Sequence, residues 1–599
     1  MDKQKKNIRK LHFGVMCSGE ELQAWQVECI RLLIADGHTC DLLIVDANEV
    51  PKKTTPQKIG GYLSSTGLYH LYQRLFFRPK AKNLESINPI LNLISKETPF
   101  PPPPAEAERM AGRGRAGVGG VKKTLLPLKG DDGVGSIHCL TTKKNYSEYF
   151  SESDIQTIKS HQLDFILRFG FNIIRGEILH SAKNGVWSFH HDDEQKYRGG
   201  PPGFWEILKN DPVTGTILQR LTDKLDGGII LKKGFFRTID HSYAGQIDQL
   251  YFASAEWPLQ VCRDIENNVA AYTEGAQSKT SAKVYKAPSN LAMFNFWFRI
   301  LNNKIRFHYQ ELFRPEDWNV GIAKTGITSF AENFDVNSLT WLPQPPKCKY
   351  YADPFAFQVG EELHIVFEDY DYKSRLGKIS QIVYSDGKFS EATIVIEEGF
   401  HLSYPYIFEI NGEFYCIPES ANAKQVRLYK YDIALGVFHF DKLLLDNFPG
   451  VDPTVFKYDN KWWLFATDKK QSNASLHIFY ADKFDGPYLP HGNNPVKTDI
   501  RTSRPAGTPF VRNDELIRPA QDCSKTYGGR IALNRVVELT EKTFKEETLK
   551  YIGPIKNSKF NIGFHTISMV GDYTIFDGKR FRFNQWNFIY KMKEKLKIG

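Results

Sequence analysis

The chain has 599 residues, of which 41% are hydrophobic and 25% are charged, and its net charge is +9. This length is too great for a single hydrophobic core, so several domains are expected. The charge excess is small for the length, and no dense basic stripe with interleaved aromatic residues occurs. Nucleic acid is therefore not an expected partner, and the basic N-terminal arm (residues 1–10) is interpreted as a solvated segment.

The eight cysteines are scattered along the chain without a CxxC pair or a Cys/His spacing typical of zinc ligands. Neither a structural metal nor a disulfide framework is expected. The N-terminus lacks the apolar region of a signal peptide, and no apolar run approaches the roughly 18 residues of a transmembrane segment. These features favour a cytoplasmic protein with reduced thiols and no transmembrane segment.

Residues 11–267 alternate between strand-like and helix-like patterns. LHFGVMCSG is typical of a strand, the following residues carry apolar side chains at helical spacing up to Gly37, and CDLLIVDA is typical of a second strand. LDFILRFG and VWSFHH are further strand-like runs. The order strand, helix, strand predicts an α/β domain with a parallel sheet.

Two segments interrupt these patterns. Residues 98–135 are rich in Pro, Gly, Ala and Arg and have almost nothing to bury, which predicts a disordered insertion. Residues 268–304 begin with a polar stretch and are interpreted as an interdomain linker.

Residues 305–599 have a β-like pattern that repeats roughly every 45–50 residues, a period typical of propeller blades. Each repeat begins with a proline-containing start, followed by an apolar strand, a polar turn and an aromatic strand. Three segments follow this template closely: YADPFAFQVGEELHIVFED, SYPYIFEINGEFYCIPES and VDPTVFKYDNKWWLFATD. With two weaker repeats near the C-terminus, the pattern predicts an all-β five-bladed propeller.

The segment from Leu163 to Leu231 resembles the formyltransferase family that uses N10-formyltetrahydrofolate. His190 falls on the histidine of that family, KYRGG (residues 196–200) on its loop motif, and Asp226 on its aspartate. The resemblance implies a Rossmann-like formyltransferase fold, a folate cofactor and an amine acceptor, such as a sugar or a nucleotide-sugar. It also implies that these residues bind substrate or cofactor: His191, Tyr197, Arg198, Gly199 and Gly200.

Formyl transfer needs a group that moves the amine proton and a donor for the oxygen that gains negative charge. His190 suits the first task, Asp226 would orient it, and Ser188 lies on the same face of the strand as His190. The family has Asn where this chain has Ser188, and its apolar loop is replaced here by Asp192, Asp193, Glu194 and Gln195. Such a loop favours a cationic partner, and metal binding by HHDDE (residues 190–194) is a further alternative.

The Asp-Pro starts at Asp353 and Asp452 resemble those of five-bladed glycoside hydrolases. Those enzymes carry a general acid in a Glu-Gly-Pro start, where this chain has Ser403-Tyr404-Pro405, and Glu419 is a possible substitute. ADPF, IPES, DPTVF, RPAG and RPAQD together resemble the propeller of plant glucosamine inositolphosphorylceramide transferases. The expected channel residues are Asp353, Glu419, Asp452, Arg504, Arg518, Gln521, Asp522 and His565.

Three functions remain open from the sequence. The first is formyl transfer to a sugar amine in the synthesis of surface glycans, with the propeller binding carbohydrate. The second is a propeller that acts as a glycosidase or in glycosyl transfer beside a degenerate formyltransferase domain. The third is a glycan-binding protein without catalytic activity.

Overall fold

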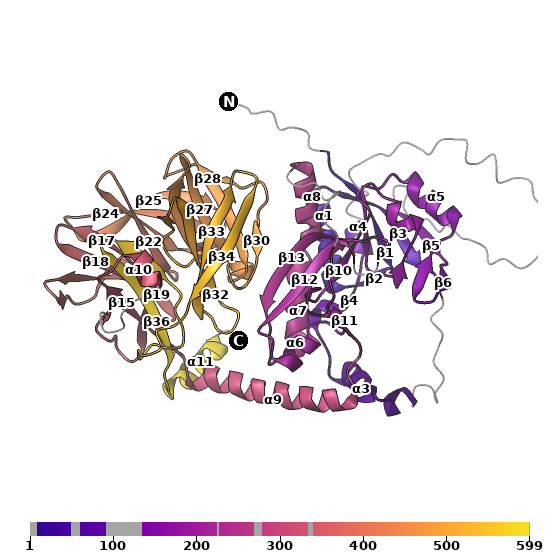
Figure 1. The fold of residues 1–599 in the computed structure, drawn as a ribbon, viewed down its shortest axis with the longest axis horizontal. Coiled ribbons are helices and arrows are strands. Elements are labelled where there is room, and N and C mark those ends of the chain that lie inside the picture. Colours follow the sequence, from indigo (N-terminus) through magenta and orange to yellow (C-terminus); the bar gives the residue numbers. More distant parts are fainter. Residues whose placement is uncertain are drawn as a thin grey trace, which may run out of the picture. The chain divides into compact units, whose positions relative to one another are not determined.

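The computed structural model describes residues 9–48, 60–91, 134–224, 227–268, 278–332 and 339–597. The chain is multidomain, as predicted, and divides into two compact units. The first unit comprises Met1–Trp205, Gly215–Lys233 and Tyr243–Phe294, and the second comprises Glu206–Thr214, Gly234–Ser242 and Asn295–Gly599. Figure 1 shows an α/β part at the start of the chain and a strand-rich part at its end.

A seven-stranded sheet in the order β13-β12-β10-β8-β1-β3-β5 forms the centre of the α/β part. The strands from β10 to β5 run parallel to one another, whereas β12 is antiparallel to β10. The predicted parallel sheet is therefore present. Its strands are β1 (His12–Cys17), β3 (Thr39–Asp46), β5 (Gly135–Cys139), β8 (Phe165–Arg168), β10 (Val186–His190), β12 (Val213–Arg220) and β13 (Ile229–Arg237).

The helix predicted between the first two strands is α1 (Ala24–Ala35). It begins with a capping box between Gln23 and Gln26, and the chain turns away at Gly37, whose φ of 92° suits glycine. The other helices and short strands of this part are β2 (Glu21–Gln23), α3 (Gly67–Leu75), β4 (Leu84–Ser86), α4 (Asn88–Leu91), β6 (Thr142–Lys144), β7 (Ser147–Tyr149), α5 (Glu152–Ser160), β9 (Ile173–Ile174), β11 (Arg198–Gly199), α6 (Phe204–Lys209), α7 (Tyr243–Ser254), α8 (Trp257–Glu266) and β14 (Val284–Tyr285).

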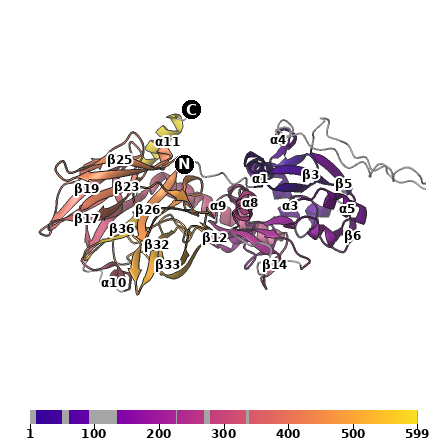
Figure 2. The ribbon, with the colours of Figure 1, turned by 90° about the horizontal axis from the view of Figure 1, so that it is seen from above.

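The central strands are apolar on both faces, as expected for parallel strands covered by helices on both sides. In β1, Phe13, Val15 and Met16 are fully buried, and in β8 Phe165, Ile166 and Leu167 are fully buried as well. Figure 2 shows helices beside both faces of this sheet. The polar side chains of these two strands are Arg168 at the end of β8, and Ser188 and His190 in β10.

The segment predicted as a linker contains regular structure. Residues 269–277 lie outside the described part, but β14 pairs in parallel with β11, and α9 (Asn290–Phe313) includes the domain boundary predicted at residue 305. The start of α9, NLAMFNFWF, is strongly apolar; Met293 and Phe296 are fully buried, whereas Leu291, Phe294 and Phe298 are exposed. Of the predicted insertion 98–135, residues 98–133 lie outside the described part and Gly135 begins β5.

Within the described residues, no helix is both long and apolar enough to span a lipid bilayer.

Five antiparallel sheets, each with four strands along its main path, occupy the described residues from 316 to 581. Their orders are β16-β15-β36-β35, β17-β18-β19-β20, β22-β23-β24-β25, β26-β27-β28-β29 and β31-β32-β33-β34. The first sheet combines strands from both ends of this region, because β15 pairs with β36 over eight residues. This pairing ties the start of the strand-rich region to its end.

The strands of the five sheets match the predicted repeats. They are β15 (Glu316–Ala323), β16 (Leu339–Trp341), β17 (Lys349–Val359), β18 (Glu362–Asp371), β19 (Leu376–Ser385), β20 (Lys388–Phe389), β21 (Thr393–Ile396), β22 (Ser403–Ile410), β23 (Glu413–Glu419), β24 (Gln425–Asp432), β25 (Val437–Asp446), β26 (Gly450–Tyr458), β27 (Lys461–Asp468), β28 (Ser475–Ala481), β29 (Leu489–Pro490), β30 (Lys497–Thr498), β31 (Phe510–Arg512), β32 (Glu515–Asp522), β33 (Arg530–Leu539), β34 (Phe544–Ile552), β35 (Ile567–Val570) and β36 (Tyr573–Phe581). Helices α10 (Ile327–Glu332) and α11 (Trp586–Lys597) accompany them.

The proline-containing starts share one backbone feature. Asp353, Tyr404 and Asp452 each precede a proline and have φ values of 52°, 43° and 51°. The register of the strand pairing shifts at each of these points. A bulge redirects a side chain, and left-handed backbone costs energy for residues other than glycine. The repeat seen in the sequence therefore marks a strained bulge that recurs in three neighbouring sheets.

Candidate functional site

A cavity of about 420 Å³ lies beside the C-terminal half of β10. Ser188 and His190 both line it, as their alternation along one strand predicts. Arg198 and Gly199 of the predicted loop motif line it as well. Four of the residues predicted from the sequence therefore meet in one cavity, whose volume is in the range of small-molecule sites.

Arg168, at the end of β8, is a cavity residue that sequence reasoning missed. Its Nε and Nη2 donate to Ser188 Oγ at 3.2 and 2.9 Å, and its Nη1 donates to the carbonyls of Phe171 and Asn172. Within the described residues, no carboxylate lies within 4 Å of this guanidinium. Burial lowers the pKa of Arg168, although an arginine still stays charged near neutral pH. The sequence signal that could have identified Arg168 is the presence of a charged residue inside the apolar run LDFILRFG.

His190 is half-buried at the end of β10. Its Nε2 lies 3.4 Å from the carbonyl oxygen of Tyr197, and Thr216 Oγ1 donates to its backbone carbonyl. Asp226, predicted to orient this histidine, lies outside the described residues, so the pairing stays a prediction. The described acid nearest to it in sequence, Asp223, lines the same cavity.

Three predicted binding residues do not line this cavity. The side chain of His191 points to the opposite face of β10 and packs among Trp25, Phe189 and Tyr251, where burial holds its pKa well below the usual range. Alternation along a strand gives adjacent residues opposite faces, which explains the error. Tyr197 is buried against Tyr285, and Gly200 takes part through its backbone only.

Gly199 holds the loop motif in place by close backbone contact. It has a φ of 90°, and a Cβ added there would lie 2.2 Å from the carbonyl oxygen of Tyr285. The pairing of β11 with β14 therefore requires a residue without a side chain at this position. The close approach of β11 and β14 explains why the loop motif has a glycine at position 199.

The acidic loop after His190 does not present free carboxylates. Asp192 accepts a hydrogen bond from the backbone N–H of Gly203 at 2.8 Å, and Lys233 Nζ lies 3.0 Å from oxygens of both Asp193 and Glu194. All three acids are buried. The expected attraction of a cationic or metal-bound partner is therefore wrong, because these charges are used inside the fold.

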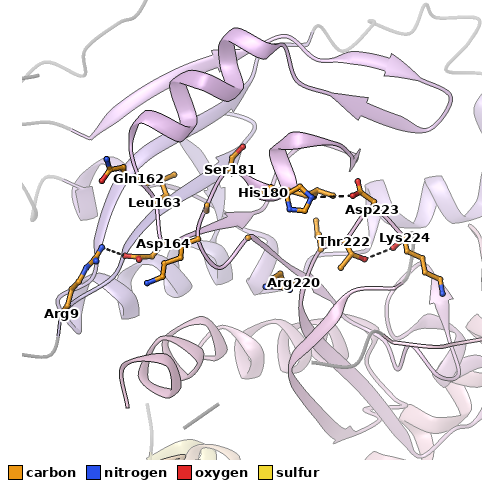
Figure 3. Close-up of a pocket in the computed structure, with 15 residues that line it drawn as sticks. Arg9, Gln162, Leu163, Asp164, His180, Ser181, Arg220, Thr222, Asp223 and Lys224 are labelled. Carbon is orange, nitrogen blue, oxygen red and sulfur yellow. Dashed lines mark hydrogen bonds and ion pairs between the residues drawn. The ribbon is translucent and has the colours of Figure 1, made fainter. Parts of the chain in front are cut away.

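A larger cavity of about 910 Å³ adjoins the first one, since both are lined by the stretch from Leu221 to Lys224. Figure 3 shows Arg9 paired with Asp164 on one side and His180 near Asp223 on the other. Arg220, Lys183 and Lys224 also line it. The two cavities together form a basic recess along the edge of β10 and β12.

In the strand-rich region, the side chain of Asp452 is held by two partners. Arg504 donates to both of its carboxylate oxygens at 2.6 and 3.1 Å, and Gln521 Nε2 donates at 2.7 Å. Glu419 Oε2 lies 3.9 Å from Arg504 Nη2. Four predicted channel residues therefore lie close together. Three of them come from different sheets and one from a connecting segment: Glu419, Asp452, Gln521 and Arg504.

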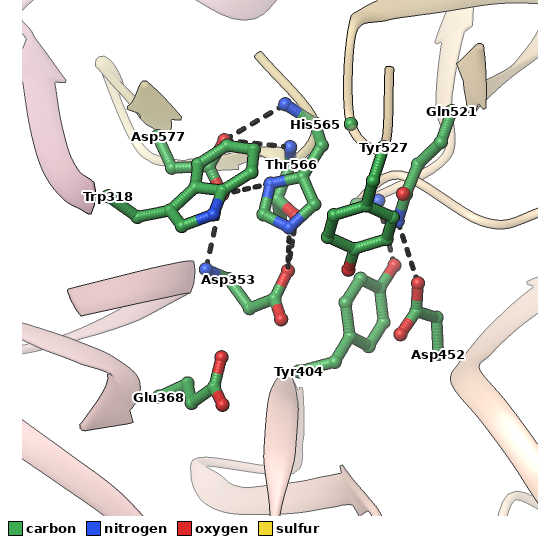
Figure 4. Close-up of polar contacts among 12 residues, drawn as sticks. Trp318, Asp353, Glu368, Tyr404, Asp452, Gln521, Tyr527, His565, Thr566 and Asp577 are labelled. Atoms are coloured by element: carbon green, nitrogen blue, oxygen red, sulfur yellow. Dashed lines mark hydrogen bonds and ion pairs between the residues drawn. The ribbon is translucent and has the colours of Figure 1, made fainter. Parts of the chain in front are cut away.

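His565 connects two further carboxylates (Figure 4). Its Nε2 lies 3.2 Å from Asp353 Oδ1 and its Nδ1 lies 2.5 Å from Asp577 Oδ2. Burial opposes the charged ring, but the charges of Asp577 and Asp353 outweigh it and raise the pKa of His565. Trp318 stacks on the imidazole with ring centroids 4.0 Å apart. Asp577 and Trp318 were missed because they lie in the strands that close the first sheet.

Glu368, in the second half of β18, belongs to the same group and was also missed. Burial and the charges of Asp353 and Glu419 hold the pKa of Glu368 well above its usual range. Burial and the charge of Asp452 raise the pKa of Glu419 to about 8, with Arg504 opposing. Burial raises the pKa of Asp353 to about 6, although the charge of His565 lowers it. We call Asp353, Glu368, Glu419, Asp452 and Asp577 the carboxylate cluster.

Tyr404 occupies the bulge at the start of β22, directly after Ser403, which aligns with the glutamate of the Glu-Gly-Pro start. Its hydroxyl accepts the N–H of Gly507 at 2.7 Å and bonds Thr454 Oγ1 at 2.9 Å. The hydroxyl is buried, and burial raises the pKa of Tyr404 well above its usual range. The phenol thus makes structural contacts with Thr454 and Gly507, and Ser403 offers no carboxyl group at the position of the expected acid.

Arg518 and Asp522 do not join the carboxylate cluster. Arg518 pairs with Glu546 of β34 at 2.7 Å, and Asp522 accepts from Arg530 of β33 at 2.8 Å. Along β32 they lie on the face opposite Gln521, because their numbers differ from 521 by odd steps. Each residue forms an ion pair with a neighbouring strand of its own sheet. The prediction that Arg518 and Asp522 are channel residues is therefore wrong.

The strand-rich region matches a known family model. Residues 342–563 match the family described as "Glucosamine inositolphosphorylceramide transferase 1, N-terminal". The protein of that name from Oryza sativa subsp. japonica is 33% identical over 205 residues, which are 33% of this chain and 27% of the relative. Its counterpart from Arabidopsis thaliana is 29% identical over the same length. The chain therefore spans about a quarter of the length of these curated relatives.

The α/β part is similar to methionyl-tRNA formyltransferases. The enzyme from Clostridium perfringens (strain 13 / Type A) is 27% identical over 186 residues, which are 31% of this chain and 56% of the relative. One from Prochlorococcus marinus is 24% identical over 244 residues, 39% of this chain and 65% of the relative. These matches are weaker than those of the strand-rich region.

Solved structures give only distant likenesses. A family 117 glycoside hydrolase from Zobellia galactanivorans has 14% identity and a TM-score of 0.29, covering 45% of this chain and 91% of its own. An α-L-arabinanase from Cellvibrio cellulosa has 15% identity and a TM-score of 0.26, and the match covers 33% of this chain and 77% of the arabinanase chain. Likenesses at this level carry no argument about fold or function. The two parts of the chain thus match two different groups of proteins, a formyltransferase group and a glycosyl-lipid transferase group, and each of these matches covers less than half of the chain.

Proposed function

We propose that the α/β part transfers a formyl group from N10-formyltetrahydrofolate to the amine of a sugar or nucleotide-sugar in the synthesis of surface glycans. We propose further that the five sheets form a closed five-bladed propeller that binds this carbohydrate. The observation that carries the first proposal is the cavity in which Ser188, His190 and Arg168 meet. The similarity of this part to methionyl-tRNA formyltransferases supports it.

The residues of this cavity fit a folate-dependent transfer. When bound, the folate supplies the activated formyl carbon. Ser188 Oγ accepts two hydrogen bonds from Arg168, so its own O–H remains free to donate into the cavity. A donor bonded to a buried cation is a stronger donor than an isolated hydroxyl. The Arg168–Ser188 pair can thus perform the task that Asn performs in the family.

His190 has the role of proton carrier. The attacking amine loses one proton as its nitrogen bonds to the formyl carbon, and His190 accepts that proton. The bond between the carbon and the folate nitrogen then breaks, and the same proton is returned to that nitrogen. Arg168 and Ser188 stabilise the oxygen that carries negative charge between these two steps. The reaction is balanced and requires no further reagent.

All eight cysteines are free thiols, which supports a reducing compartment, and we propose the cytoplasm as the location. A second candidate, glycosyl transfer in sphingolipid glycan synthesis, is favoured by the family match of residues 342–563. The different pKa values of Glu419 and Asp353, about 8 and about 6, would suit an acid and a base for such chemistry.

Calorimetric titration with 5-formyltetrahydrofolate, a stable analogue, tests the formyl-transfer proposal. We expect saturable binding to the wild type, binding within about threefold for His190→Ala, and binding about tenfold weaker for Arg168→Met, since a hydrogen bond to a charged group contributes roughly that much. His138→Ala, an exposed residue of β5, serves as the matched control. Absence of binding to the wild type would overturn the proposal and leave glycosyl transfer as the remaining candidate.

A further inference from the structure

The carboxylate cluster holds more negative charge than its neighbours balance. Arg504 pairs with Asp452, and His565 lies between Asp353 and Asp577. Five carboxyl groups thus face two basic groups. Glu419 lies 3.9 Å from Arg504, which already pairs with Asp452, and among the described residues Glu368 has only the ring of His401 within 4 Å. Buried carboxyl groups without a counter-charge either hold a proton or bind a cation.

Glu368 is the most exceptional member of the cluster. The residue is 4% exposed, yet no described residue donates a hydrogen bond to its carboxylate. Figure 4 shows its side chain directed towards Asp353 with no contact drawn to it. The nearest basic nitrogen, His401 Nε2, is 3.7 Å away, and burial lowers the pKa of His401 to about 4, so that ring is neutral at neutral pH. A buried acid of this kind either keeps its proton or accepts a ligand from outside the fold.

Glu419 provides the opening to solvent. Its side chain is 13% exposed, whereas that of Asp452 beside it is fully buried. The charged groups around it are Asp452, Arg504, Asp353 and Glu368, from four different segments. Glu419 and Glu368 interact electrostatically, so a ligand that reaches Glu419 also lies near Glu368.

A metal ion fits this place poorly. The ligand atoms of Asp353, His565 and Asp577 lie within 4.8 Å of one another. Both ring nitrogens of His565, however, already face carboxylates, and the charges of these acids favour the doubly protonated ring, which has no lone pair to offer a metal. Asp577 Oδ1 also accepts the backbone N–H groups of His565 and Thr566.

An aromatic ring beside the acids favours a sugar. Tyr527 is half-buried, its ring lies 5.4 Å from that of His565, and Arg504 lies 5.0 Å from its centre. In Figure 4 this ring stands between His565 and Gln521, close to the carboxylates. Aromatic faces stack on sugar rings and attract cations, whereas carboxylates bind ammonium groups.

We propose that the carboxylate cluster binds the ammonium group of an amino sugar, with Glu368 and Glu419 receiving the charge and Tyr527 contacting the sugar ring. This inference rests on the proposed carbohydrate-binding role of the strand-rich region, and not on folate binding. It adds that the carbohydrate is cationic, so the α/β part would act on the amine that the other part recognises. Binding of the ammonium favours the ionised forms of Glu368 and Glu419, so it releases protons.

Calorimetry of the full chain with glucosamine and with the uncharged N-acetylglucosamine tests the inference. We expect glucosamine to bind about tenfold more tightly, with an enthalpy that depends on the buffer because a proton is released. Glu368→Gln should remove this preference, and it keeps the shape of the side chain. Glu362→Gln is the matched control, since this acid lies on the same strand with 56% of its side chain exposed.

The possible outcomes separate this inference from the proposed function. Equal binding of the two sugars, or an unchanged preference in Glu368→Gln, would overturn the ammonium site while keeping carbohydrate binding. Absence of binding by both sugars would overturn both. Calcium binding without sugar, with proton release that Glu368→Gln abolishes, would identify a metal site instead and overturn the inference. Failure to bind 5-formyltetrahydrofolate affects only the formyl-transfer proposal.

Discussion

At the scale of single residues, both candidate sites depend on charged side chains that follow apolar stretches within strands. Arg168 follows an apolar run in β8, and Glu368 follows one in β18. A charge in such a place is costly unless the neighbouring strands supply partners or a ligand does. Arg168 has carbonyl and hydroxyl partners, whereas Glu368 has none that donates a hydrogen bond. Arg168 is therefore a structural part of its cavity, whereas Glu368 is the acid that we propose to bind a cationic ligand.

Glu419 gives a prediction about stability and pH. Its pKa in the folded protein is about 8, against about 4.5 when exposed, so the folded state binds the proton more tightly. The contribution of Glu419 to the free energy of unfolding is therefore fully present below pH 4.5 and is lost as pH rises towards 8. Since a tenfold change in proton affinity corresponds to about 1.4 kcal/mol, the loss in free energy of unfolding should exceed that value.

Denaturant unfolding of Glu419→Gln at pH 5 to 8 measures this effect. The variant keeps a neutral side chain, so its stability should fall less with rising pH than that of the wild type. The matched control is Glu413→Gln on the same strand, where hydrogen bonds from Lys430 and Tyr415 lower the pKa of an exposed acid. Parallel curves for wild type and Glu419→Gln would contradict the proposed buried proton.

At the scale of elements, short pairings decide which residues reach the sites. The pairing of β11 with β14 brings Arg198 and Gly199 to the cavity, and the recurrent bulge at Asp353, Tyr404 and Asp452 orients the starts of three sheets. Each pairing depends on a backbone conformation that most residues avoid. The sites are therefore sensitive to substitutions that change no charge.

Gly199→Ala tests the role of the β11–β14 pairing. The added Cβ would lie 2.2 Å from the carbonyl of Tyr285 in a backbone with φ of 90°, so we expect a loss of about 2 kcal/mol or more in stability. Binding of 5-formyltetrahydrofolate should weaken as well. Gly200→Ala is the control, because its nearest atom would be 3.8 Å away. Equal melting temperatures for the two variants would disprove the required close approach.

At the scale of the whole molecule, two compact units carry two sites of opposite charge. The α/β cavity is lined by Arg168, Arg175, Arg198 and Lys224, whereas the carboxylate cluster carries excess negative charge. The two units match different groups of proteins. A chain of this kind can bind the donor and the acceptor of one reaction in separate units.

Differential scanning calorimetry tests this separation. We expect two unfolding transitions, with 5-formyltetrahydrofolate raising one and glucosamine raising the other. A ligand at a hundred times its dissociation constant adds about 2.7 kcal/mol to the unit that binds it. His190→Ala should leave the glucosamine effect unchanged. A single transition that both ligands raise would show that the units unfold together and would contradict independent sites.

The sequence by itself determined what depends on neighbours along the chain. Alternation along β10 placed Ser188 and His190 on one face, and the repeated proline starts predicted the strand-rich sheets. The tertiary structure decided what depends on strands distant in sequence. Arg168 reaches Ser188 only because β8 and β10 run parallel, and Glu368 meets Glu419 only because separate sheets converge. Arg518 and Asp522 form ion pairs within their own sheet for a related reason. Periodicity along a strand predicts on which face of the sheet a side chain lies, but it does not predict which residue of a neighbouring strand contacts it.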